Sequence, residues 1–205
     1  MNIKAEQSRL YATHNEKYGD SAILVNNAYI GSSIYRRKFI GITGNMVVDG
    51  IIAKKSIEIL QDRSGTFYET LVLLDISNGN EILRITENTE MKAILYSSVE
   101  EDIIEKAHAA GISLFAIHNH PTGWPPTADD CVSANVRGYI KGVAVGHNGT
   151  VNIYYPSEII FTEEECDEIH CIIAEKAAYE SNINVILNTW KSVLSEFGMT
   201  IIERR

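Results

Sequence analysis

Two histidines one residue apart are the residues of this sequence best suited to chemistry. His118 and His120 follow a short and nearly all apolar run, residues 112–117, which is typical of a buried central strand. Side chains two residues apart on a strand point to the same face, so both imidazoles can bind one ion. Pro121 then ends the strand. Such a pair alone is more often a surface or core pair than a metal site, so its neighbours decide the interpretation.

A third donor follows a Pro-rich turn. A helix that begins after Thr127 would bring Asp130 back towards the two histidines. Two nitrogens and one oxygen would then face a tetrahedral zinc whose fourth position is open to water, which is the ligand set of a catalytic site. The same Thr-x-x-Asp spacing also fits a capping box, which starts a helix without any metal. The preceding strand, the proline and the returning carboxylate together favour the metal site.

The stretch from Ile117 to Asp130 resembles the signature of the JAMM metalloproteases, also called MPN-plus or JAB domains. That signature is an upstream Glu, then His-x-His-Pro, then Ser-x-x-Asp. The His-Asn-His-Pro form with following Gly and Pro is similar to bacterial RadC-type and phage-associated JAB domains, and the resemblance covers roughly residues 50–156. It implies that His118 and His120 are zinc ligands. It also implies a JAB/MPN-like, cytidine-deaminase-like fold.

The sequence departs from this family in the spacing of the third ligand. The family's usual loop would put Ala128 at the Ser position and Cys131 at the Asp position. A shift by one residue restores a hydroxyl and a carboxylate at Thr127 and Asp130. We therefore prefer Asp130 to Asp129 as the ligand. Cysteine also binds zinc, so Cys131 stays open as an alternative.

A zinc hydrolase also needs a base that takes a proton from the attacking water. Family placement points to Glu69, at the head of an apolar strand pattern, although it could also be an exposed strand-end carboxylate. Other candidates for the base, with worse placement in the sequence, are Glu81, Glu87 and Glu90. The hydroxyl of Thr127 is expected to help hold the developing oxyanion.

The elements that must position these residues follow from periodicity and turn signals. They predict an α/β (α+β) fold with a mixed central sheet flanked by helices, and two further helices at the C-terminal end. Helices are expected from residue 49 to a stop at 62–65, over 98–110 with a capping box at Ser98 and Glu101, over 128–139, over 163–179 and from about 183 to 197. Strands are expected at 67–76, 81–86, 91–96, 112–117, 141–145 and 150–155, with 199–205 as a strand or tail.

The chain is expected to divide into three parts. Residues 1–48 form an irregular N-terminal arm, 49–157 form the JAB/MPN-like zinc hydrolase domain, and 158–205 form a C-terminal helical extension. The apolar stripes of this extension should pack on the domain, on a partner or on a second copy of the chain. His147 has no partner pattern, and Cys166, His170 and Cys171 fit a packed or solvated helix. Trp124 either lines a substrate channel or covers its turn.

Composition limits the classes of function. The 205 residues carry a net charge of −9, the wrong sign for a protein that binds duplex nucleic acid. No apolar run approaches a membrane span, and an odd number of cysteines without a CxxC pair indicates reduced thiols, so we expect a cytoplasmic protein. The predicted function is a zinc metallopeptidase that hydrolyses a peptide or isopeptide bond, with a ubiquitin-like conjugate or precursor as a candidate substrate. The alternative is a non-catalytic MPN-type scaffold or interaction module.

Overall fold

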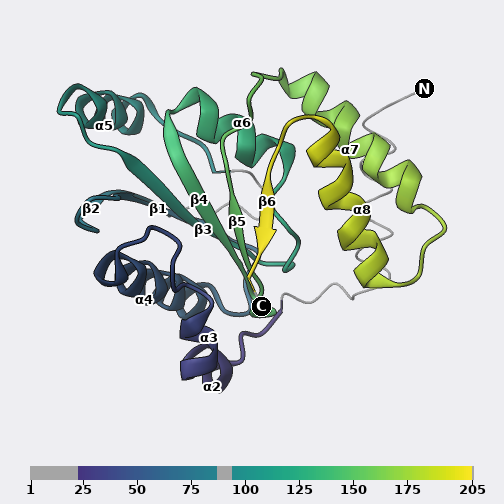
Figure 1. The fold of residues 1–205 in the computed structure, drawn as a ribbon, viewed down its shortest axis with the longest axis horizontal. Coiled ribbons are helices and arrows are strands. Elements are labelled where there is room, and N and C mark those ends of the chain that lie inside the picture. The colour runs from purple at the N-terminus through teal and green to yellow at the C-terminus, as the bar shows by residue number, and fades with distance from the viewer. Residues whose placement is uncertain (1–22, 87–93, 205) are drawn as a thin grey trace.

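A computed structural model describes residues 23–86 and 94–204 of the chain (Figure 1). Its helices are α2 (Asn27–Ile30), α3 (Ser33–Arg37), α4 (Met46–Arg63), α5 (Ser98–Ala109), α6 (Ala128–Val136), α7 (Glu163–Ala177) and α8 (Ile183–Glu196). Its strands are β1 (Thr70–Asp75), β2 (Glu81–Thr86), β3 (Leu114–His120), β4 (Tyr139–Gly146), β5 (Val151–Tyr154) and β6 (Ile201–Glu203).

The strands form one mixed sheet in the order β2-β1-β3-β4-β5-β6. Strands β3 and β4 are parallel and all other neighbours are antiparallel. Strand β3 lies inside the sheet, and all of its residues are buried, as its apolar run predicts. A mixed sheet flanked by helices confirms the general fold class expected from the sequence.

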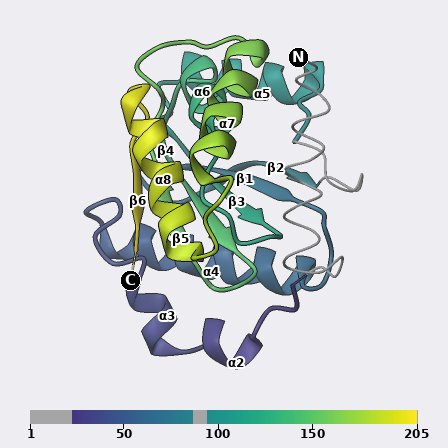
Figure 2. The ribbon, with the colours of Figure 1, turned by 90° about the vertical axis from the view of Figure 1, so that its right-hand side faces the viewer.

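Helices cover both faces of the sheet, so the domain has three layers (Figure 2). One face packs against α5, α6, α7 and α8, and its core includes Leu71 and Leu73 of β1 and Leu114 and Ala116 of β3. The C-terminal helices belong to this core through the apolar side chains of their inner faces: Cys166, Ile169, Ile173, Val193 and Leu194.

The opposite face packs against α2, α3 and α4. Its core takes the alternate residues of the same strands, such as Val72 of β1 and Ile117 of β3. The irregular arm expected over residues 1–48 is wrong for 23–45, because 27–30 and 33–37 form short helices. Tyr35 and Phe39 there are almost fully buried against α4 and the sheet.

The C-terminal end of the chain returns to the sheet. Strand β6 pairs antiparallel with β5, so that Tyr154 lies opposite Ile201. Of the strand or tail expected over 199–205, the structure shows a strand at Ile201–Glu203. It adds a sixth strand to the sheet of the expected 49–157 domain.

Local boundaries differ from the sequence expectations in a few places. The capping box of α5 uses Ser97 and Glu100, one residue earlier than expected. Strand β3 continues through His120 because its parallel pairing with β4 extends to Gly146. Residues 91–93 of the expected strand at 91–96 lie outside the described residues, and 94–96 are not in a strand.

Candidate metal centre

The two histidines lie on β3, on the face that α6 covers. Strand alternation places His118 and His120 on the same side as Leu114 and Ala116, which pack against α5 to α8. Asn119, between them, points to the opposite face. The exposed fraction of the side chain is only 3% for His118 and 10% for His120.

The N-terminus of α6 supplies the third group. Thr127 is the N-cap, and its hydroxyl oxygen accepts a hydrogen bond from the backbone N–H of Asp130. In return the Asp130 carboxylate accepts from the Thr127 backbone N–H at 2.7 Å and from the Thr127 hydroxyl at 3.0 Å. The capping box and the metal-site interpretation of this spacing are therefore compatible, since the box aims the carboxylate at the histidines.

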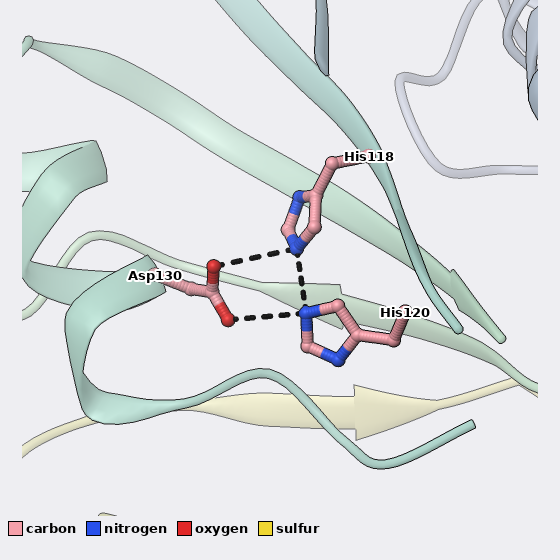
Figure 3. A group of neighbouring side chains, drawn as sticks. All are labelled: His118, His120 and Asp130. Atoms are coloured by element: carbon pink, nitrogen blue, oxygen red, sulfur yellow. Dashed lines mark hydrogen bonds and ion pairs between the residues drawn. The ribbon is translucent and has the colours of Figure 1, made fainter. Parts of the chain in front are cut away.

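The three side chains converge on one point (Figure 3). His118 Nε2 lies 2.9 Å from His120 Nε2 and 3.3 Å from one Asp130 oxygen, and His120 Nε2 lies 3.4 Å from the other. A zinc tetrahedron with bonds of about 2.0–2.1 Å has edges of about 3.3 Å. The observed spacings approach one face of such a tetrahedron, and His118, His120 and Asp130 are the one group of potential metal ligands found among the described residues.

The Nδ1 atoms of both rings have hydrogen-bond partners, and the partner of His120 fixes where its proton lies. His120 Nδ1 lies 2.9 Å from the carbonyl oxygen of Trp124, which can only accept, so Nδ1 carries a proton in either charge state of the ring and Nε2 is the nitrogen left for a metal. His118 Nδ1 lies 3.3 Å from the hydroxyl of the fully buried Tyr154. Outer partners of this kind orient the histidines of metal sites.

The pKa values of the two histidines shift in opposite directions. Burial lowers the pKa of His118 to about 4, so its ring is neutral. Burial acts in the same direction on His120, but the hydrogen bond and charge of Asp130, with the charge of Glu69, outweigh it and raise the pKa of His120 to about 9. For Asp130, burial is opposed by both histidines, which hold its pKa well below the usual range. A cation that binds through His120 Nε2 would therefore have to displace a proton from that ring.

Glu69 lies directly before β1 and beside this group. The antiparallel register that pairs Leu71 with His118 brings the start of β1 next to the end of β3. Burial raises the pKa of the Glu69 carboxyl to about 7, and the charges of His120 and Asp130 also act on it. A half-buried carboxyl group with this pKa can take up and release a proton near neutral pH.

The other sequence candidates lie elsewhere. Cys131 is fully buried in the apolar core under α6, where burial raises the pKa of its thiol. The side chain of Asp129 is 52% exposed and faces His170. Glu81 is paired with Lys55 and Arg84. Glu87 and Glu90 lie outside the described residues.

Sequence reasoning missed the contacts of the C-terminal helices with the ligand loop. Trp190 of α8 donates its indole N–H to the carbonyl of Pro126 at 3.0 Å, and its ring packs against Trp124. The backbone N–H of Ala128 donates to His170 of α7 at 3.3 Å, and the His170 ring stacks on Trp190. These two bonds lie on either side of Thr127, so α7 and α8 help to fix the residue that holds Asp130.

Comparison with known proteins finds no relative: no family model, no curated protein and no solved structure matches this chain. Functional inference therefore rests on the residues and geometry of the site.

Proposed function

We propose that this chain is a zinc-dependent metallopeptidase of the JAMM type. The observation that carries the proposal is the convergence of His118, His120 and Asp130, with all three donor atoms within 4.8 Å of one another. Neutral imidazole and carboxylate are donors that zinc accepts, and three protein ligands leave a position for water or substrate. The Asp130 side chain keeps 22% of its surface exposed, which supports access to that position.

When bound, zinc would polarise a carbonyl group and lower the pKa of a nearby water. Glu69 then acts as general base: it takes a proton from the attacking water and delivers it to the leaving amine. A pKa of about 7 suits both transfers, because the protonated and ionised forms of Glu69 are both well populated at neutral pH. His120 and His118 contribute Nε2 lone pairs, held by Trp124 and Tyr154 behind them.

Thr127 has a defined role in holding the third ligand. Its single hydroxyl proton is directed to the Asp130 carboxylate. Stabilisation of an oxyanion by the same hydroxyl stays a prediction, and it requires the hydroxyl to turn away from Asp130 when substrate binds.

The substrate class proposed is a protein or peptide, with an isopeptide-linked ubiquitin-like conjugate or precursor among the candidates. None of the helices in the described residues is both long and apolar enough to cross a membrane. All three cysteines are free, two of them buried, which supports our proposal of a cytoplasmic, reducing location. The net charge of −9 supports a protein rather than a nucleic-acid partner.

The test compares zinc-loaded wild-type protein with Glu69→Gln on unfolded casein, quenched fluorescent peptides and isopeptide-linked ubiquitin-like conjugates. We expect cleavage of at least one probe by the wild type, and a loss of about 10²–10⁴-fold in kcat in the variant, since the amide cannot accept the proton. Zinc content should be equal in both proteins. A fully zinc-loaded wild type that cleaves none of these probes would support the non-catalytic scaffold instead.

A further inference from the structure

Asn119, the residue between the two histidines, is fully buried on the face of the sheet opposite to them. Its side-chain oxygen accepts a hydrogen bond from the backbone N–H of Thr70 at 2.8 Å. Its amide nitrogen donates to the backbone carbonyl of Tyr68 at 3.1 Å and contacts His147 Nε2 at 3.1 Å. All the polar atoms of this amide are therefore used.

The two backbone partners of Asn119 are the residues on either side of Glu69. The backbone pairing between β1 and β3 ends at Leu71 and His118. Beyond that point the Asn119 side chain takes the place of the strand partner and holds the chain before and after Glu69. Among the described residues the Glu69 carboxylate has no hydrogen bond of its own, so its position depends on this backbone.

His147 supports Asn119 from behind. Its Nδ1 lies 3.1 Å from the carbonyl oxygen of Ile23, which only accepts, so Nδ1 carries the proton and Nε2 accepts from Asn119. The backbone N–H of His147 also donates to the carbonyl of His120 at 3.2 Å. His147 thus connects the turn after β4 with β3 and with the segment before α2.

We propose that Asn119 is a positioning residue for Glu69, and that His147 fixes the orientation of the Asn119 amide. This inference rests on the proposed function, in which Glu69 is the general base. A base must lie within hydrogen-bond reach of the proton that it takes. The central residue of the His-x-His pair therefore has a separate role, since the histidines hold the metal on one face of β3 and Asn119 holds the base from the other.

The kinetic test uses Asn119→Ser, Glu69→Gln, the double variant and Val72→Ala. Val72 lies on β1, on the same face as Asn119, and its truncation weakens the same strand without touching any of these hydrogen bonds. On the probe that the wild type cleaves, Asn119→Ser should lower kcat at least about 10-fold with KM and zinc content unchanged, and Val72→Ala should not. In the Glu69→Gln background Asn119→Ser should cause no further loss.

Two results would overturn the proposal. One is a kcat of Asn119→Ser equal to that of the wild type. The other is that Asn119→Ser lowers kcat by the same factor in the Glu69→Gln background as in the wild type. If Asn119→Ser does not fold, His147→Phe and His147→Gln replace it. The first removes the acceptor and should lower kcat, and the second supplies an amide oxygen in its place and should restore it. Equal kcat values in these two variants would also overturn the proposal.

A second readout needs neither zinc nor turnover, so it separates failure of this inference from failure of the proposed function. In the metal-free protein, backbone amides over residues 66–70 should exchange with deuterium at least about 10-fold faster in Asn119→Ser than in Val72→Ala. Equal exchange rates in the two variants would show that Asn119 does not hold the Glu69 segment. If exchange is faster in Asn119→Ser but the wild type cleaves no probe, the contact between Asn119 and the Glu69 segment is supported and the proposed peptidase activity is not.

Discussion

Trp190 of α8 donates a hydrogen bond of 3.0 Å to the carbonyl oxygen of Pro126, in the loop that leads to Asp130. The C-terminal helices are thereby joined to the candidate metal centre as well as to the core. The Trp190 ring also packs between the rings of Trp124 and His170. The Trp124 carbonyl faces His120, and the His170 ring accepts from the backbone N–H of Ala128. A change in α8 should therefore alter metal binding.

We expect Trp190→Phe to weaken zinc binding severalfold. Phenylalanine keeps the stacking but removes the indole N–H, and one hydrogen bond contributes about 1 kcal/mol. Competition with a chromophoric chelator measures the change. Phe197→Leu, at the end of the same helix and packed on Phe161, is the matched control and should bind zinc like the wild type. Equal affinities in both variants would show that α8 does not constrain the loop.

The second prediction concerns Tyr154 behind His118. Tyr154→Phe removes the hydroxyl 3.3 Å from His118 Nδ1 and should lower zinc affinity about 10–100-fold, as expected for the outer partner of a ligating histidine. Tyr139→Phe is the control, because Tyr139 is a buried tyrosine on the neighbouring strand whose hydroxyl binds Tyr96. If the two variants bind zinc equally well, Tyr154 does not orient the ligand.

The third prediction decides the third ligand. Asp130→Ala should lose zinc, whereas Cys131→Ala should retain it, because the Cys131 side chain lies in the apolar core. Asp129→Ala should also retain zinc, since that carboxylate faces His170. The cobalt-substituted protein should lack the intense near-ultraviolet band of sulfur coordination. Metal loss in Cys131→Ala together with retention in Asp130→Ala would assign the thiolate instead.

Local signals predicted the three converging groups. The His-x-His spacing requires one strand face, and a Thr-x-x-Asp helix start returns a carboxylate. Both signals act within a few residues, which is why periodicity and spacing were sufficient. In the structure a capping box places Asp130 in the first turn of α6, whereas the sequence left Cys131 open as the third ligand.

The outer partners could not be predicted in this way. Tyr154, His170 and Trp190 reach the site across 36, 42 and 64 residues, and only the packing of β5, α7 and α8 brings them there. Asn119 is an exception, because a polar residue between two ligands on a buried strand must point to the opposite face and find partners there. That alternation was visible in the sequence, but its partners Tyr68, Thr70 and His147 were not.

A fourth prediction concerns protons released when zinc binds. In the metal-free site the pKa of His120 is raised to about 9, so its ring carries a proton at pH 8, whereas His118 is neutral and Glu69 is mostly ionised. A ligating imidazole must be neutral. Zinc should therefore displace at least the His120 proton at pH 8, and apparent affinity should rise with pH until about pH 9.

Calorimetry in buffers of different ionisation enthalpy measures this release. Glu69→Gln should release the same number of protons at pH 8, which excludes Glu69 as their source. Zinc binding with no proton release at pH 8, or release that increases from pH 8 to pH 10, would contradict the charge state assigned to His120.

The central claim is that His118, His120 and Asp130 form a zinc site. Elemental analysis of the purified protein after zinc loading and gel filtration tests it most directly. We predict close to one zinc per wild-type chain and close to none in His118→Ala and in His120→Ala, because two remaining ligands hold zinc too weakly to survive filtration. A wild type without zinc, or both histidine variants with an unchanged zinc content, would contradict this assignment.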